Sequence, residues 1–385
     1  MSALLVAALS PAAAAKDPRR WTEAPLSRIT LEYFQGIASD PAGRIFFDGV
    51  RTGLYRTDPA LRETARNSNV IPPSVSQSEF YNHVGDIAWD AREGGRVLLP
   101  LECFNENSMP GTEDPGNCSG RGAVGVADPE TLQWRYHVNL DPAEIPKVSW
   151  HAVSEDGRLL WTHSRDDLLA YSLDDISAAN ASPAGPIRAV RVLRGRSPLR
   201  NINGGAFFRG RLYVAAQTGA LFQVFSVDVD TGARRLEIER QINGESEGVD
   251  FFPGLGGVLH WMIMPNSRTG PPTYGGGGTG VLLHFFPRGE APPGMRPRIR
   301  VSVKPKTVDA DKRVRYRFTA TWRFGETTEP VANALIRFDG KRLRTDSEGR
   351  ASKRRRIEEP GRHKAKATAA GFRGGEARVR VRPRR

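Results

Sequence analysis

The chain has 385 residues, with 56 Lys and Arg against 43 Asp and Glu, which gives a formal net charge of +13. Its 39% of hydrophobic residues exclude a wholly disordered protein, and its length predicts two or three domains. Two cysteines exclude a disulfide-dense mini-protein and a multi-cysteine zinc or iron–sulfur protein. After the first fifteen residues, no apolar run is long enough to predict a membrane-spanning helix.

The N-terminus, residues 1–15, predicts a signal peptide. An apolar run, Leu4–Leu9, is followed by small residues, Ala12–Ala15, in the Ala-x-Ala arrangement that signal peptidase cleaves. We therefore expect a secreted or cell-surface, extracytoplasmic protein. The alternative is that the same segment is a disordered Ala-rich tail.

A repeated unit then organises the chain up to residue 288. Gly-Arg followed by three apolar residues begins at Gly43, Gly95, Gly157 and Gly210, and a weaker copy begins at Gly257. Each copy follows a short strand pattern that ends in a turn, and each precedes a third strand pattern. Fourth strands are predicted at 134–138, 188–192 and 236–239. Four short strands in each unit of about 50 residues are typical of a β-propeller blade.

The last unit lacks a fourth strand of its own before the composition changes. Residues 28–33, upstream of the first unit, could supply that strand and leave no exposed edge. We therefore predict a five-bladed β-propeller over residues 27–288, closed by an N-terminal strand. Six blades are the alternative, if the stretch between Cys103 and Cys118 hides another unit.

The phrase Gly-Ile-Ala-x-Asp-Pro-x-Gly-x-Ile-Phe at residues 36–46 resembles the repeats of NHL, YVTN and strictosidine-synthase-like propellers. Such propellers include ligand-binding scaffolds, lactonases and streptogramin-type lyases. The resemblance therefore implies a fold and leaves the activity open.

The two cysteines bracket a loop rich in Gly, Pro and Asn. In an exported protein we expect Cys103 and Cys118 to form a disulfide, and closing fifteen residues would stabilise the fold by roughly 3 kcal/mol. Two free thiols are the alternative. Both this loop and the Pro- and Gly-rich segment at 271–278 connect second to third strands, so we expect them on the same face of the propeller.

Polar residues at the beginnings of the first strands should surround the channel on that face. These residues, here called the channel ring, are Gln35, His83, Asp86, Glu102, His151, Asn203 and Glu247. Carboxylate, amide and imidazole groups that converge from several blades could hold a divalent cation such as calcium or act as a general base. Gln35, His151 and Glu247 are the predicted metal ligands. The alternative is that these side chains only satisfy backbone groups or line a water-filled channel.

Two catalytic motifs are not supported by their context. Ser246 lies in a Gly-x-Ser-x-Gly match, but the nucleophile elbow needs a helix after the serine, and a strand pattern follows here. The glycines at 275–280 lack the Gly-Lys-Ser/Thr ending of a phosphate-binding loop.

A basic region follows a Pro- and Gly-rich linker at 289–296. Residues 296–385 hold 28 Lys and Arg against 10 Asp and Glu, a net charge of +18, so the rest of the chain is slightly acidic. Alternating strands and the Thr-Asp-x-x-Gly turn at 345–349 resemble bacterial Ig-like, carboxypeptidase-regulatory-like β-sandwiches. We predict such a domain over residues 297–385.

The excess of positive charge predicts binding to an anionic cell-surface polymer through residues 296–385. A merely solvated Arg-rich face is the alternative, and nucleic acid is disfavoured because no stacking pattern or recognition helix is present. The leading hypothesis is an exported, non-catalytic ligand- or cell-surface-binding protein. The competing hypothesis is a metal-dependent hydrolase or lyase that uses the channel ring.

Overall fold

The computed structural model describes residues 20–33, 35–49, 52–103, 122–195, 201–242, 244–252, 257–265, 279–291, 296–324 and 327–384. Almost every regular element in these ranges is a strand, so the fold is all-β. The single α-helix of the described residues, α1 (Pro73–Ser76), is one turn long. No helix in these ranges has the length and apolar character needed to cross a membrane.

Antiparallel sheets of four or five short strands, described here in chain order, fill residues 21–287. The first contains β2 (Ile37–Ser39), β3 (Ile45–Asp48), β4 (Leu54–Thr57) and β5 (Glu63–Asn67). The second contains β6 (His83–Val84), β7 (Ala88–Asp90), β8 (Arg96–Glu102), β9 (Ala123–Ala127) and β10 (Trp134–Asn139). The third contains β11 (Ala152–Val153), β12 (Leu159–Ser164), β13 (Asp167–Ser172) and β14 (Arg191–Leu193).

Two further sheets complete this part of the chain. The fourth contains β15 (Ile202–Phe208), β16 (Arg211–Thr218), β17 (Leu221–Val227) and β18 (Arg234–Gln241). The fifth contains β19 (Gly244–Phe252), β20 (Val258–Pro265), β21 (Thr279–Pro287) and β1 (Trp21–Thr30).

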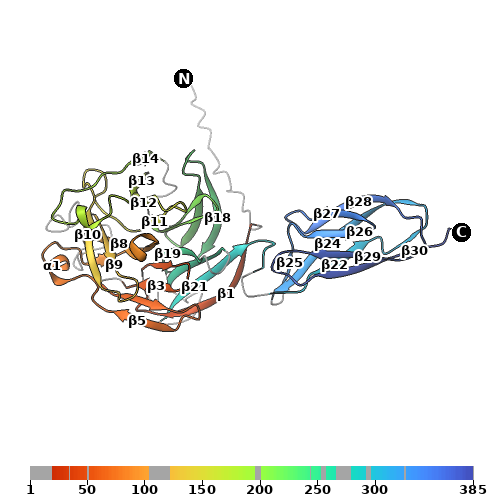
Figure 1. Ribbon diagram of the computed structural model, residues 1–385, viewed down its shortest axis with the longest axis horizontal. Coiled ribbons are helices and arrows are strands. Elements are labelled where there is room, and N and C mark those ends of the chain that lie inside the picture. Colours follow the sequence, from red (N-terminus) through yellow and green to blue (C-terminus); the bar gives the residue numbers. More distant parts are fainter. Residues whose placement is uncertain are drawn as a thin grey trace, which may run out of the picture.

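The innermost strands of these sheets form a closed ring. β2 contacts β7, β7 contacts β11, β11 contacts β15, β15 contacts β19, and β19 contacts β2 again. Figure 1 shows the sheets arranged around this common centre. A ring of four-stranded sheets packed around an axis is a β-propeller fold.

The N-terminal strand closes the ring, as the sequence predicted, although it begins earlier and ends sooner than expected. β1 pairs antiparallel with β21, from Trp21 opposite Pro287 to Thr30 opposite Thr279. It therefore forms the outermost strand of the fifth sheet, which consists otherwise of residues from the other end of the propeller.

The repeated Gly-Arg unit serves the packing between sheets. Its apolar residues are buried, as in Phe46, Leu98 and Trp161. In the first copy the arginine turns back to the aspartate that follows β2: Arg44 Nε lies 2.5 Å from Asp40 Oδ2. Arg44 also pairs with Glu130 of the second sheet, so one side chain joins two sheets.

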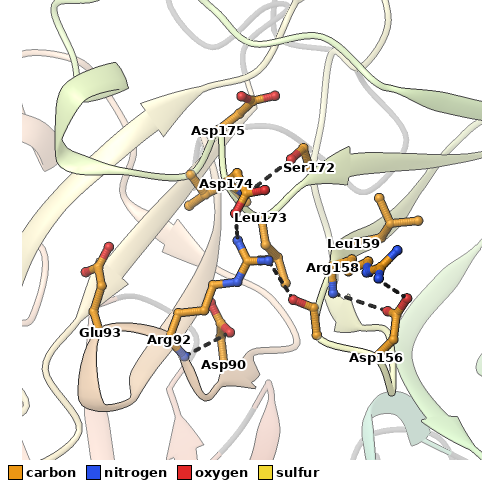
Figure 2. Close-up of polar contacts among 12 residues, drawn as sticks. Asp90, Arg92, Glu93, Asp156, Arg158, Leu159, Ser172, Leu173, Asp174 and Asp175 are labelled. Atoms are coloured by element: carbon orange, nitrogen blue, oxygen red, sulfur yellow. Dashed lines mark hydrogen bonds and ion pairs between the residues drawn. The ribbon is translucent and has the colours of Figure 1, made fainter.

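Arg96 makes the corresponding link one sheet further on. Its Nε lies 2.6 Å from Asp90 Oδ2, and its Nη2 donates to the carbonyl oxygen of Leu173, just after β13 of the third sheet, at 3.2 Å. Its side chain is completely buried. Figure 2 shows a parallel contact, in which Arg92 of the 3-10 helix η1 (Arg92–Gly94) pairs with Asp174 at 2.7 Å.

The C-terminal part contains two sheets around one core. One sheet holds β22 (Arg300–Lys304), β24 (Arg313–Phe324), β25 (Thr327–Pro330) and β28 (Arg350–Arg356). The other holds β23 (Thr307–Asp309), β30 (Gly375–Arg382), β29 (Gly361–Thr368), β26 (Leu335–Phe338) and β27 (Lys341–Arg344). Tyr316, Phe318 and Trp322 of the first sheet share a core with Ile336 and Phe338 of the second.

This C-terminal part lies beside the propeller (Figure 1). The rings of Phe286 and Trp322 lie 6.2 Å apart across the junction. The hydroxyl of Thr22 donates to Glu329 at 3.2 Å. Apolar and polar contacts therefore both connect the two parts.

Candidate functional site

Asp86, at the bend between β6 and β7, lies at the centre of the ring. Its side chain is completely buried, and its carboxylate accepts hydrogen bonds from three sheets: from the backbone N–H of Ile37 at 2.9 Å, Gly205 at 3.0 Å and Val249 at 3.2 Å. Its backbone carbonyl accepts from the N–H of His151 at 2.9 Å, which adds the third sheet. Asp86 therefore joins all the sheets at the axis.

The backbone approaches the axis so closely that only glycine fits there. A Cβ atom on Gly248 would lie 2.1 Å from Asp86 Oδ1, and one on Gly204 would lie 2.8 Å from Asp86 Oδ2. A Cβ on Gly36 would lie 2.3 Å from Asp48 Oδ1. The Asp86 carboxylate thus fills the space between the glycines, and within the described residues the axis is packed at this level.

Six of the seven channel-ring residues divide into three groups, and His151 stands apart from them. Asp86 is a structural centre, since its carboxylate oxygens are used by backbone N–H groups. His83 Nδ1 lies 2.7 Å from Glu102 Oε1, and Lys147 Nζ lies 3.4 Å from the other oxygen of the same carboxylate. Gln35, Asn203 and Glu247 lie near the meeting point of the first, fourth and fifth sheets.

Backbone and side-chain contacts hold this last group. The N–H of Gly248, next to Glu247, donates to the carbonyl of Gln35 at 2.9 Å. Asn203 Nδ2 donates to the carbonyl of Ser246 at 2.6 Å. Ser246 lies within β19 and its Oγ accepts from Trp261 Nε1 at 2.9 Å, so it does not occupy a strand-to-helix turn.

The carboxylates near the axis strongly influence one another. Burial raises the pKa of Glu247 well above its usual value, and the nearby carboxylates of Glu245, Asp86 and Glu102 raise it further. Burial also raises the pKa of Asp86 well above its usual value, although its three N–H donors oppose this shift. Both groups therefore hold their protons more tightly than exposed carboxyl groups do.

Asp48 adds another buried carboxylate, one that the sequence analysis missed. It ends β3, is completely buried, and neither of its side-chain oxygens has a hydrogen-bond partner among the described residues. Burial raises its pKa well above the usual value, and Asp86 and Glu247 contribute to the same direction. Its signal in the sequence was an aspartate directly after an apolar strand.

Lys147 was also missed. It supplies a positive charge to Glu102, and it and Lys16 are the two lysines in residues 1–295. In this part of the chain nearly all bases are arginines. A lysine among them is the signal in the sequence that could have indicated a particular role for Lys147.

His151 is isolated by comparison. It is completely buried, and neither ring nitrogen has a hydrogen-bond partner in the described part of the chain. Burial lowers its pKa to about 3, so the imidazole is neutral at ordinary pH. It joins the ring through its backbone N–H.

The described residues contain no group of three or more His, Cys, Asp and Glu side chains arranged to hold a metal ion. Gln35, His151 and Glu247 therefore stay a predicted ligand set. Of the predicted disulfide, Cys103 is not a free thiol, and Cys118 lies outside the described residues. The loop between Cys103 and Cys118 and the segment at 271–278, which were predicted to share one face, also lie outside the described residues.

A second candidate site lies on the outer faces of the C-terminal sheets, where like charges stand directly opposite each other. In the sheet that contains β22, β24 and β28, Arg313 is opposite Arg356, Arg315 is opposite Arg354, and Arg317 is opposite Lys304. In the sheet that contains β26, β27, β29 and β30, the opposed pairs are Arg337 with Arg342, Lys364 with Arg378, and Arg362 with Arg380.

No protein-family model matches the chain, and no curated protein is similar to it. Distant structural matches are β-propeller proteins. Glutaminyl cyclase of Myxococcus xanthus is 11% identical over 69% of this chain and 97% of that chain, with a TM-score of 0.43. A glucose dehydrogenase is 11% identical over 68% of this chain and 98% of that chain, with a TM-score of 0.40.

The extracellular domain of a hybrid two-component system from B. thetaiotaomicron is 12% identical over 91% of this chain, with a TM-score of 0.38. This chain spans 44% of that chain's length. Such low TM-scores carry no argument about ligand or activity. The class of the protein, an all-β protein with a β-propeller fold, rests on its own ring of sheets.

Proposed function

We propose that this is an exported, non-catalytic recognition protein with two binding surfaces. A five-bladed propeller over residues 27–288 would offer the channel ring to a small ligand. An Ig-like, carboxypeptidase-regulatory-like sandwich over residues 297–385 would bind an anionic cell-surface polymer. The closed ring of innermost strands supports the blade count, and the shared core of two sheets supports the sandwich.

The observation that carries this proposal is the set of opposed like charges on the C-terminal sheets. Like charges directly opposite each other destabilise a sheet. The arrangement is nevertheless repeated on both outer faces, at Arg315 opposite Arg354 and at Arg362 opposite Arg380. A polyanion bound across these pairs would attract both members and so offset their mutual repulsion. Binding to a polyanion therefore explains why the pattern is tolerated.

The competing proposal is a metal-dependent hydrolase or lyase. One observation favours it: Glu247 is buried beside other carboxylates, and its raised pKa is common among catalytic acids and bases. Calorimetric titration of Ca²⁺ into the protein tests it, with Glu247→Gln as the comparison. If the wild type binds calcium and the variant does not, the enzyme proposal is favoured. If the wild type does not bind calcium, the proposed cofactor of the enzyme is ruled out.

Binding of the full chain to dextran sulfate, with neutral dextran as the matched control, tests the leading proposal. Both polymers have the same sugar backbone and differ in charge. We expect binding to dextran sulfate alone. Equal binding to both polymers, or binding to neither, would contradict a charge-reading module.

A further inference from the structure

The two outer faces of the C-terminal sheets are both basic, but they are not equivalent. We define the basic face as the exposed bases of β22, β24 and β28 that have no ion pair among the described residues. Counting only the register positions that alternate with the core residues, and so leaving out Lys353 opposite the buried Tyr316, they are Arg300, Lys304, Arg313, Arg315, Arg317, Arg350 and Arg354.

No acidic residue occurs anywhere in β22, β24 or β28. At the margin, Asp311 pairs with Arg356 at 3.0 Å and so neutralises that one arginine. The strands of this sheet therefore do not neutralise the positive charge of the basic face, which can attract an anionic partner.

The opposite face is partly neutralised by its own strands. Glu376 of β30 lies 3.1 Å from Arg378 and 3.9 Å from Lys364. Asp309 of β23 lies 3.0 Å from Arg382. This face therefore attracts anions less strongly for the same number of bases.

The geometry of the basic face suits an extended chain. Successive outward residues of a strand are roughly 7 Å apart, and neighbouring strands are about 4.8 Å apart. The rows Arg313–Arg356, Arg315–Arg354 and Lys304–Arg317 follow one another along β24. A linear polymer lying along β24 would meet cationic side chains at each of these steps.

Among its described residues, the same face has no aromatic side chain on which a nucleic-acid base could stack. Tyr316, Phe318 and Trp322 of β24 all point to the opposite side and are buried in the core. Proteins that bind single-stranded nucleic acid generally add aromatic stacking to the charge attraction. An acyclic polymer that offers only charge fits this face better.

We infer that the basic face binds a linear polyol phosphate, a polymer of phosphodiester-linked acyclic units, laid along β24. This inference rests on the proposed polyanion binding and assigns its surface and its ligand class. Guanidinium groups suit it because they form forked hydrogen bonds with phosphate oxygens.

The test compares two triple variants of the full chain with poly(glycerol phosphate) as the probe, at about 50 mM salt, where such contacts are strong. One variant, Arg313→Gln, Arg315→Gln and Arg354→Gln, removes three charges from the basic face. The matched control, Arg337→Gln, Arg362→Gln and Arg380→Gln, removes three exposed, unpaired arginines from the opposite face.

We expect the first variant to bind about tenfold more weakly or worse, and the control to change affinity by less than about threefold. Thermal unfolding should show the first variant at least as stable as the wild type, because it loses like-charge pairs. Equal losses in both variants, or a larger loss in the control, would overturn the assignment of the face. A lower melting temperature of the first variant than of the wild type would contradict the like-charge repulsion from which the proposal is argued.

Two further outcomes distinguish a failure of the ligand class from a failure of the proposed function. Tighter binding of the wild type to oligo(dT) than to poly(glycerol phosphate), at equal phosphate concentration, would overturn the ligand class and favour nucleic acid. Binding to neither of these polymers nor to dextran sulfate would instead reject the proposed function itself.

Discussion

Asp86 shows what a single residue does at the centre of this fold. The backbone N–H groups of Ile37, Gly205 and Val249 all donate to its carboxylate. At the axis, this side chain takes the place that a backbone carbonyl has within a sheet. Asp86 was predicted in the channel ring as a candidate ligand-binding residue, with the satisfying of backbone groups as the alternative, and its carboxylate accepts from three backbone N–H groups. The hydrogen bonds from three other sheets depend on the closed ring, which no local pattern of the sequence reveals.

Asp86→Ala should destabilise the protein by about 3 to 5 kcal/mol, because three buried donors would lose their acceptor. Urea unfolding of the variant measures this loss. Asp156→Ala is the control, since the Asp156 side chain is 58% exposed, and it should change stability by less than about 1 kcal/mol. A loss as small as that of the control would show that Asp86 is not the structural centre.

Asp250 gives the fold a particular pH dependence. Its Oδ2 accepts from Ser39 Oγ at 2.5 Å, and burial raises its pKa to about 7. Because the folded state holds this proton more tightly than the unfolded state, the stability that Asp250 contributes is complete below about pH 4. It is lost as the pH rises toward 7.

The stability of the wild type relative to Asp250→Asn should therefore fall between about pH 4 and pH 7. We expect a change of about 3 kcal/mol across this range, measured by urea unfolding at each pH. Asp156→Asn should show no such trend, since a hydrogen bond from Ser154 lowers the pKa of Asp156 and its titration lies below this range. A flat difference for Asp250→Asn would contradict the raised pKa.

At the scale of the elements, the Gly-Arg repeat is a structural device. Its period predicted the second and third strands because burial against neighbouring sheets requires apolar triads at each repeat. β5 was missed, because Glu63–Asn67 is polar and largely exposed and has no apolar pattern to detect. The limits of β1 were also wrong, since its pairing with β21 is set by residues some 250 positions away.

Arg96→Met should destabilise the protein by about 3 to 5 kcal/mol, because Asp90 would be left buried without its cation. Arg158→Met, at the same position of the next repeat, is the matched control. Arg158 is 81% exposed and 3.8 Å from Asp156, so its loss should be within about 0.5 kcal/mol. Similar losses in urea unfolding would contradict a special role for the buried arginine.

The whole molecule separates its charges between its two parts. Counting the charged residues along the sequence predicted this division. The buried cluster of Asp48, Asp86 and Glu247 could not be predicted in the same way, because it depends on which strands meet at the axis. The difference between the two basic faces likewise depends on strand pairing across the sheet.

The salt dependence of binding tests the central claim most directly. The affinity of the full chain for poly(glycerol phosphate) is measured between about 50 and 300 mM NaCl. Seven unpaired bases on the basic face predict that the logarithm of the affinity falls linearly with the logarithm of the salt concentration, with a slope of about −3 to −5. An affinity that does not change with salt would contradict recognition of a polyanion by this face.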